Sequence, residues 1–335
     1  DVLKLCLLFP HQTPDNWDVL KLCLYQPEIK GIVLTHPNYL GFGAEIAEIA
    51  DFAKQHALTL IVDEAHGAHL NFCPPDYPQA AERFSADVIV QSTHKTLSSL
   101  TQSALLHINT DTIDVRRLDF FLRVYQTTSP SYLLMNALEE AVLYAEEHAR
   151  SIFSSMIDWH KEAVETINQT TPFYVRPRSE TYDYTKLIVQ TTQAGFGGYE
   201  VEQYLNTQNI VIEYASDNYI LAMLGIGSRA EDLQALAMAL GGLSQRREKD
   251  EFRKALPVPQ AILAMHEAFR LQAEEVDLAA SCGRISADLI VPYPPGIPLL
   301  LPGEKIDAEI ISSIAASAAA GAVIGIKENR ILVTK

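Results

Sequence analysis

Residues 60–70 read LIVDEAHGAHL and residues 87–95 read DVIVQSTHK, and these two stretches decide the fold prediction. Residues 59–62 and 87–90 are short apolar runs rich in β-branched side chains, as is typical of buried parallel strands. Each run gives way to polar residues at its C-terminal end. Open α/β sheets bind ligands at that edge. The two stretches therefore predict neighbouring strands of an α/β sheet with a functional edge.

Asp63 and Lys95 are the two residue types that pyridoxal phosphate requires of a protein. A lysine amine forms a Schiff base with the aldehyde of this cofactor, and a carboxylate keeps its pyridine nitrogen protonated. Ala65, two residues after the aspartate, is small enough to let a flat ring approach the backbone. This pattern predicts a pyridoxal phosphate site.

Each of these residues also has a simpler structural interpretation. An aspartate at a strand end is usually a turn or N-cap residue, and a lysine in a polar loop is usually solvated. The joint pattern at two strand ends favours the cofactor site. Ser92, Thr93 and His94, directly before the lysine, add hydroxyl and imidazole donors for a phosphate group.

The composition is that of an ordinary globular protein. The chain has 335 residues, of which 48% are hydrophobic, and this length predicts two or three domains. The formal charge of −16 argues against a nucleic-acid partner and would draw cationic small molecules toward the surface. The four cysteines form no CxxC pair, so we expect no metal site and no disulfide framework.

Hydropathy gives no indication of a membrane protein. No apolar run reaches the length of a membrane span, and residues 1–9 lack the features of a signal peptide. We therefore expect a cytoplasmic protein with no membrane partner.

A short duplication marks the beginning of the chain. DVLKLCL occurs at residues 1–7 and again at residues 18–24. A single repeat of this length cannot form a solenoid, which needs several stacked units. We interpret the second copy as a short helix and the first, within residues 1–17, as a segment of doubtful structural role.

Periodicity and turn residues predict the remaining elements. The expected strands are residues 31–35, 103–108 and 186–190, with two more near Ile210 and Tyr219. The expected helices are residues 44–56, 133–167, 199–207, 230–243 and 260–273. Residues 245–254 form a charged linker, and the five prolines of residues 291–304 exclude a helix there and impose an extended path.

Five stretches together resemble one known family. In chain order they are VDEAHGAH (62–69), QSTHKTLSSLTQSALLHI (91–108), TSPSYLL (128–134), GRISADLI (283–290) and YPPGIPLLLPGE (293–304). On these residues the chain resembles the prokaryotic Orn/Lys/Arg decarboxylases, pyridoxal phosphate enzymes of the aminotransferase-like fold type I. The resemblance covers nearly the whole chain after Trp17, and ordinary aminotransferases do not carry the last stretch.

The resemblance implies three parts. These are a partial cofactor-binding α/β large domain (residues 1–150), a smaller α+β domain (151–245) and a C-terminal domain of the decarboxylase family (255–335). It also implies a homodimer or higher oligomer whose subunits share their active sites, with Thr128 and Ser129 reaching the neighbouring subunit's phosphate.

The resemblance also implies roles for residues of the two motifs. Lys95 would hold the cofactor through its amine, and Asp63 would pair with the pyridinium nitrogen. Ser92 and His94 would lie at the phosphate or beside the Schiff base. His66 would lie near the ring and the substrate; alternatively, it satisfies a backbone group of its loop.

Family members remove CO₂ from arginine, lysine or ornithine and give a diamine or agmatine, compounds of polyamine biosynthesis. Lys95 or His94 would return a proton to the α-carbon. A cationic substrate side chain needs a carboxylate partner, and Glu304 is the candidate, with Tyr293 at the start of the same stretch. The alternative for Glu304 is a solvated loop residue. Which basic amino acid is used stays open.

The chain departs from the family pattern before Asp63. Family members have a long preceding stretch with a Gly/Ser/Thr turn that cups the phosphate and a histidine that stacks on the ring, whereas only 62 residues precede Asp63 here. Without that turn we expect weaker cofactor binding. The alternatives to an active decarboxylase are therefore an inactive fragment or interaction subunit of the same fold, or an aminotransferase or aldolase of fold type I.

Overall fold

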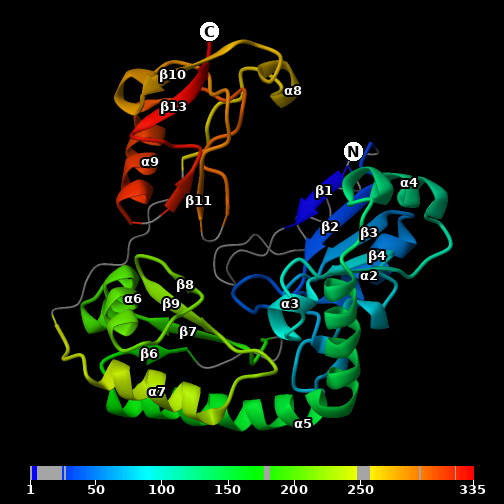
Figure 1. Ribbon diagram of the computed structural model, residues 1–335, viewed down its shortest axis with the longest axis vertical. Coiled ribbons are helices and arrows are strands. Elements are labelled where there is room, and N and C mark those ends of the chain that lie inside the picture. The colour runs from blue at the N-terminus through cyan, green and yellow to red at the C-terminus, as the bar shows by residue number, and fades with distance from the viewer. Residues whose placement is uncertain are drawn as a thin grey trace. The chain divides into compact units, whose positions relative to one another are not determined.

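The computed structural model describes residues 2–5, 25, 28–176, 182–246, 257–293, 296–320 and 322–335. The chain divides into two compact units, residues 1–249 and 250–335 (Figure 1). Each unit has its own hydrophobic core. The two units are described separately below.

A five-stranded sheet carries the first unit, with strand order β1-β2-β3-β4-β5. Its strands are β1 (Val2–Leu5), β2 (Gly31–Thr35), β3 (Thr59–Asp63), β4 (Val88–Gln91) and β5 (Leu105–Ile108). The first four run parallel and β5 is antiparallel to β4. The predicted βαβ unit is confirmed, because helix α2 (Ile46–Gln55) connects β2 to β3 and buries its apolar face in the same core.

Two helices lead from this sheet to a second one. Helix α4 (Val115–Tyr125) follows β5, and helix α5 (Tyr132–Thr170) continues beneath the second sheet, where α7 (Ala230–Gly241) packs beside it (Figure 1). Ser131 caps α5 by accepting a hydrogen bond from the Leu134 N–H.

The second sheet has four antiparallel strands in the order β6-β7-β9-β8. Its elements are β6 (Tyr174–Val175), β7 (Lys186–Gln190), β8 (Tyr214–Ala215) and β9 (Tyr219–Met223), with α6 (Gly198–Thr207) against them. The imidazole Nε2 of His160 on α5 lies 3.2 Å from the Lys186 carbonyl oxygen and ties the long helix to β7.

The second unit is a small α/β module. Its elements are α8 (Met265–Ala268), β10 (Ala273–Asp277), β11 (Val291–Tyr293), α9 (Ala308–Ala320), β12 (Ala322–Ile324) and β13 (Arg330–Thr334). β10 pairs with β13 and β11 pairs with β12, both antiparallel. No helix occupies the described part of the proline-rich stretch 291–304, as predicted.

Two of the predicted elements are wrong. Residues 260–273 contain only the short helix α8, because the N–H groups of Ile262 and Leu263 bond to the Gly303 carbonyl oxygen, at 3.0 Å each, rather than to a helix. The strand expected near Ile210 begins at Tyr214, because α6 ends in a turn with Asn209 in the left-handed region at φ 59°.

The duplicated segment is only partly described. Residues 2–5 of the first copy form the strand β1, which pairs in parallel with β2, so this copy has a structural role. The second copy, predicted to be a short helix, lies outside the described residues. Among the helices of the described chain, none is both long enough and apolar enough to cross a membrane.

Phe153 on α5 is the largest fully buried side chain of the first unit, and its ring lies 5.2 Å from the His69 ring and 5.8 Å from the Tyr77 ring. We expect Phe153→Ala to lower the free energy of unfolding by about 3–5 kcal/mol, because it removes buried area and leaves a cavity. Urea unfolding of the first unit measures this. Met238→Ala, at a side chain that is 79% exposed, is the control and should change little; equal effects of both substitutions would contradict the assignment of this core.

Candidate active site

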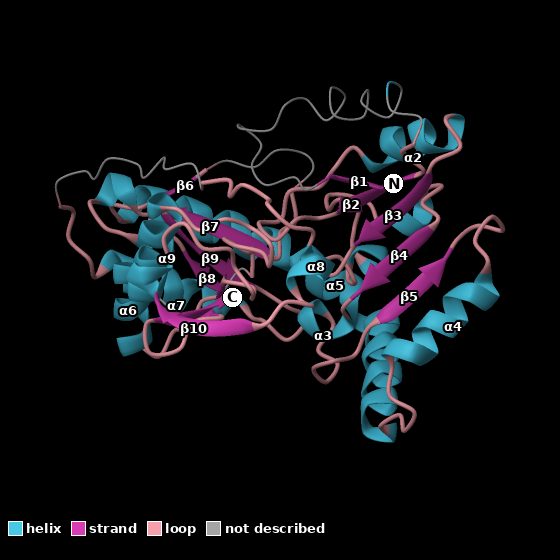
Figure 2. Cartoon of the chain, turned by 90° about the horizontal axis from the view of Figure 1, so that it is seen from above, coloured by secondary structure: helices cyan, strands magenta, loops and turns pink. Residues whose placement is uncertain are grey.

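The two sequence motifs meet at the carboxyl edge of the large sheet. Asp63 is the last residue of β3, and Lys95 lies in the short helix α3 (Thr93–Thr96) that follows β4. β3 and β4 pair in parallel with Asp63 opposite Val90, so both motifs leave the sheet on the same side (Figure 2). This is the edge at which α/β sheets bind ligands.

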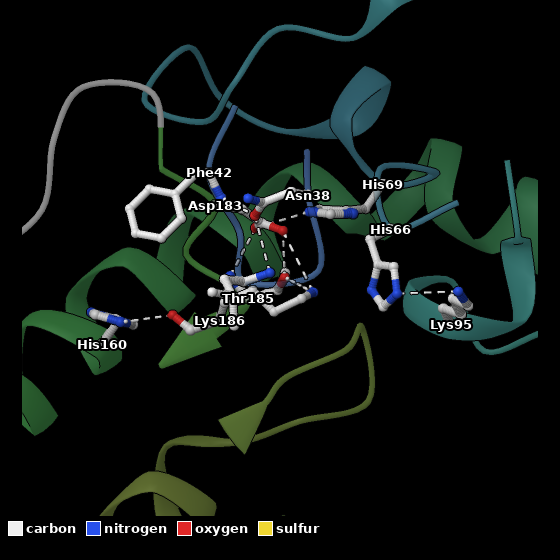
Figure 3. Close-up of polar contacts among 10 residues, drawn as sticks. Asn38, Phe42, His66, His69, Lys95, His160, Asp183, Thr185 and Lys186 are labelled. Atoms are coloured by element: carbon white, nitrogen blue, oxygen red, sulfur yellow. Dashed lines mark hydrogen bonds and ion pairs between the residues drawn. The ribbon is translucent and has the colours of Figure 1, made fainter. Parts of the chain in front are cut away.

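Lys95 and His66 form the central contact of this site. The Lys95 Nζ lies 3.1 Å from the His66 Nε2 (Figure 3). Burial, together with the charges of Lys186 and Lys95, lowers the pKa of His66 to about 2. His66 is therefore uncharged at neutral pH, and its Nε2 accepts the hydrogen bond that Lys95 donates.

The second ring nitrogen of His66, Nδ1, makes no hydrogen bond to the described part of the chain. Because Nε2 accepts from Lys95, the ring proton resides on Nδ1. Nδ1 is buried and has no hydrogen-bond partner among the described residues. The ring also meets Tyr39 edge to face at 5.1 Å between centroids. A buried donor without a partner is costly, and it suits a bound group with an acceptor atom.

Asp63 presents its carboxylate to solvent at the same edge. Its Oδ1 accepts a hydrogen bond from the Ala65 N–H at 3.1 Å, which shapes the turn after β3. Partial burial lowers the pKa of the Lys95 amine, while the negative charges of Asp63 and Glu213 act in the opposite direction. Lys95 is thus a more easily deprotonated amine than a solvated lysine.

Of the three residues before Lys95, Thr93 has a structural role, whereas Ser92 and His94 each keep a polar side-chain atom for the site. The Thr93 hydroxyl is buried and bonds to Ser99 Oγ at 2.8 Å and to the Ser103 carbonyl oxygen at 3.2 Å, so it is occupied within the protein. His94 donates from Nδ1 to the same carbonyl at 2.9 Å, which leaves its Nε2 for other partners. Ser92 is half-buried at the N-cap of α3, and its side chain makes no capping hydrogen bond.

The remaining predicted site residues belong to other segments of the chain. Thr128 and Ser129 are exposed in the connection between α4 and α5. Tyr293 and Glu304 belong to the second unit, where the Glu304 carboxylate accepts a hydrogen bond from the Leu301 N–H at 2.7 Å. This bond closes the turn before Glu304, which is half-buried rather than solvated.

A buried cluster of charges beside the site was not predicted (Figure 3). The Asp183 carboxylate accepts hydrogen bonds from His69 Nε2 at 3.1 Å and from the Thr185 hydroxyl at 2.7 Å, and Lys186 Nζ lies 3.7 Å away. The Asp183 and Lys186 side chains are fully buried. Burial acts to raise the pKa of Asp183, but His69, Lys186 and Thr185 outweigh it and hold that pKa well below its usual range.

This cluster joins the two sheets of the first unit. Asp183 precedes β7, whereas His69 belongs to the motif that follows β3. Gly41 permits the close approach, because its φ is +92° and a Cβ there would lie 2.8 Å from the Lys186 side chain. The only sequence signal was His69 inside the quoted motif, since nothing in residues 183–186 distinguishes a buried lysine from a solvated one.

No group of three or more histidine, cysteine, aspartate or glutamate side chains that could hold a metal ion occurs in the described ranges. The polar groups at the sheet edge are instead an amine, an imidazole and a carboxylate. Such a set suits an organic group that carries an aldehyde and a basic ring nitrogen.

Two family models match the chain. The Orn/Lys/Arg decarboxylase major domain matches residues 18–183, and the Orn/Lys/Arg decarboxylase C-terminal domain matches residues 246–321. An arginine decarboxylase from Bacillus subtilis (strain 168) is 30% identical over 302 residues, which cover 86% of this chain and 61% of that protein. The constitutive lysine decarboxylase of Escherichia coli (strain K12) is 24% identical and covers 69% of this chain and 45% of that protein.

Solved structures give the same fold. The E. coli constitutive lysine decarboxylase aligns with a TM-score of 0.72 and 19% identity over 92% of this chain and 58% of that chain. The pyridoxamine-pyruvate aminotransferase from Mesorhizobium loti aligns with a TM-score of 0.55 and 16% identity over 69% of this chain and 63% of that chain.

The fold class predicted from the sequence is confirmed by these similarities. The boundaries predicted for three domains remain a prediction. The chain spans about three-fifths of the length of its first curated relatives, with 62%, 61% and 63% of those proteins covered. The chain belongs to the Orn/Lys/Arg decarboxylase family.

Proposed function

We propose that this chain carries the pyridoxal phosphate-dependent decarboxylation of arginine, lysine or ornithine. The observation that carries the proposal is the 3.1 Å contact between the Lys95 amine and the uncharged His66, beside Asp63 at the carboxyl edge of the sheet. The names of the curated relatives, which are arginine and lysine decarboxylases, support the substrate class.

The residues of the edge fit this cofactor. Lys95 offers an amine with a lowered pKa for the aldehyde, and Asp63 offers an exposed carboxylate for the ring nitrogen. Ala65 is a small residue between Asp63 and His66, and the unpartnered Nδ1 of His66 offers a donor. When bound, pyridoxal phosphate supplies a ring that accepts the electron pair left at the α-carbon as CO₂ departs.

The protein's own residues have separate tasks in this proposal. Asp63 holds the proton of the ring nitrogen through its negative charge. His66 accepts a hydrogen bond from Lys95 at Nε2 and so orients the amine. Lys95 Nζ, or His94 from Nε2 when both of its ring nitrogens are protonated, returns a proton to the α-carbon after CO₂ has left. Ser92, at the N-cap of α3, offers its hydroxyl to the phosphate.

The substrate's cationic end needs a carboxylate when it is removed from water. Glu304, with Tyr293 near it in sequence, stays our proposal for this contact, although its carboxylate is already engaged by the Leu301 N–H. The products would be a diamine or agmatine and CO₂, and we propose a cytoplasmic enzyme of polyamine biosynthesis.

An inactive fragment or interaction subunit is the second candidate. It is favoured by the length of the chain, which spans about three-fifths of its curated relatives. An aminotransferase of the same fold is less favoured, because the chain also matches the decarboxylase C-terminal domain, at residues 246–321.

We also propose that a second copy of the chain covers an apolar face on α4. None of the residues of α4 is buried, and Phe120, Phe121 and Val124 are 60%, 42% and 57% exposed. Leu133, at the start of α5, is 77% exposed. Apolar side chains gathered in this way usually mark an interface. Thr128 and Ser129 follow α4 directly, so a shared site between subunits remains part of the proposal.

The first test is cofactor binding. We expect the chain mixed with pyridoxal phosphate to develop the visible absorbance of a lysine-bound pyridoxal, and Lys95→Ala to lack it, because the nearby amine of Lys186 is fully buried and paired with Asp183. Lys161→Ala, at an exposed lysine of α5, is the matched control. Identical spectra for wild type and Lys95→Ala would refute cofactor binding through Lys95.

Release of CO₂ from arginine, lysine and ornithine then identifies the substrate. Absence of CO₂ release with cofactor bound would favour the inactive fragment.

The role of Asp63 is tested separately. Asp63→Asn should still bind pyridoxal phosphate but should release CO₂ roughly 100-fold more slowly or worse, because an amide cannot hold the ring nitrogen protonated. Steady-state kinetics with the preferred amino acid measure this. Asp51→Asn, at an exposed aspartate of α2, is the control; a rate for Asp63→Asn within twofold of the control would remove Asp63 from the proposal.

The interface is tested by sedimentation velocity. Phe120→Asp places a charge in the apolar face and should shift the chain from dimer to monomer. Val211→Asp alters a side chain that is 86% exposed outside this face and should leave the oligomeric state unchanged. A wild-type chain that sediments as a monomer at all concentrations would contradict the proposed interface.

A further inference from the structure

Glu64, directly after Asp63, is a fully buried carboxyl group with no role in the proposed reaction. Its Oε1 accepts a hydrogen bond from the Ala81 N–H at 2.8 Å, and its Oε2 accepts one from Gln91 Nε2 at 2.6 Å. Gln91 is the last residue of β4, and it precedes the motif segment that leads to Lys95. One buried side chain therefore connects the two motifs of the candidate site.

A second carboxyl group meets the same amide. Gln91 Nε2 also donates to Glu82 Oε1 at 2.6 Å, and the Gln91 Oε1 lies 3.0 Å from His107 Nε2 on β5. His107 Nε2 lies 3.7 Å from Glu82 Oε1. The amide of Gln91 thus uses its two protons for two carboxyl groups. Glu82 is the titratable group that faces Glu64 across this amide, and His107 in turn faces Glu82.

This arrangement implies one shared proton. When two carboxyl groups contact one neutral amide in a buried site, ionising both of them is energetically unfavourable. Burial first, and then the negative charge of Glu82, raise the pKa of Glu64 well above its ordinary value. Glu82 Oε2 is buried without a hydrogen-bond partner among the described residues, so ionisation of both carboxyl groups would leave buried negative charge uncompensated.

The turn that carries the candidate site is folded around Glu64. The Glu64 N–H donates to the Val90 carbonyl oxygen at 2.9 Å, and the Gly67 N–H donates to the Glu64 carbonyl oxygen at 2.8 Å. A Cβ at Gly67 would lie 2.4 Å from the Glu64 Cγ, so the turn closes directly on the glutamate side chain. Asp63 and His66 flank Glu64 on this turn.

We propose that Glu64 is a positioning residue: together with Glu82 it shares one proton and clamps the turn 63–67 to Gln91, which holds Asp63 and His66 in register with Lys95. This inference rests on the proposed function for its consequence, since the clamped groups are those of the cofactor site. The proton-sharing contact that fixes the turn 63–67 does not itself depend on any cofactor.

The first arm of the test uses the whole chain without cofactor. Hydrogen–deuterium exchange of the peptide containing residues 63–67 should be at least about tenfold faster in Glu64→Ala than in wild type, because the turn loses two anchoring bonds. Glu64→Gln keeps the size of the side chain and one acceptor oxygen, so it can keep one of the two bonds and should restore part of the protection. Glu48→Gln, at an exposed glutamate of α2, is the matched control. Equal exchange in wild type and Glu64→Ala would overturn the clamp.

The second arm measures the shared proton. A carboxyl group whose pKa is raised on folding binds a proton that the unfolded chain releases above about pH 4.5, so its contribution to stability is lost as pH rises from there to the raised value. One such proton changes the unfolding equilibrium by up to tenfold per pH unit. This slope should be present in wild type and reduced in Glu64→Gln. An identical slope in both proteins would overturn the shared proton, and this comparison holds even if Glu64→Ala fails to fold.

The third arm addresses positioning and is measured with added pyridoxal phosphate. Glu64→Ala should weaken cofactor binding and shift the pH midpoint of the cofactor absorbance, with rescue by Glu64→Gln, because Asp63 and His66 are displaced from the ring. A loosened turn with unchanged affinity and pH midpoint would overturn the positioning role. If the wild-type chain binds no cofactor, the proposed function fails, whereas the first two arms still support or overturn the clamp.

Discussion

The parallel pairing of β3 and β4 is the constraint on which the candidate site depends. Asp63 lies opposite Val90, and the Glu64 N–H extends the pairing by one bond to the Val90 carbonyl oxygen. The residues that follow the two strands therefore leave the sheet at the same edge. Since the turn after β3 closes at Gly67 and α3 begins directly after β4, His66 and Lys95 meet at 3.1 Å.

Buried charges surround this meeting point and give it a defined electrostatic character. Asp183 is paired with His69 and Lys186, and Glu64 shares the amide of Gln91 with Glu82. Removing charges from water costs several kcal/mol per ion unless partners compensate, so such groups demand a defined geometry. Burial, together with the positive charges of Lys186 and Lys95, keeps His66 neutral and therefore able to accept a hydrogen bond from Lys95.

The sequence predicted the parts of the fold that depend on local pattern. The strands at 31–35 and 186–190 and the helix within 44–56 follow from apolar periodicity, and the structure contains them. The helix expected over 260–273 failed because tertiary bonds to Gly303 outweigh helix propensity. Asp63 and Lys95 were found because cofactor chemistry restricts residue type, whereas Lys186 and Glu64 were missed because burial of a charged side chain depends on partners far apart in sequence.

In the proposed site, the residues near Lys95 supply only some of the hydrogen-bond donors that the cofactor phosphate needs. An anion of this charge is usually held by several N–H and hydroxyl donors. Beside Lys95, the Thr93 hydroxyl and the His94 Nδ1 both donate to the Ser103 carbonyl oxygen, so they are committed within the protein. The Ser92 hydroxyl is the donor of this segment that stays available, and the His94 Nε2 adds a second donor only when both ring nitrogens are protonated. Because the chain spans about three-fifths of its curated relatives, we expect the other donors to come from outside the described residues, either from the segment that the relatives have in addition or from a second subunit.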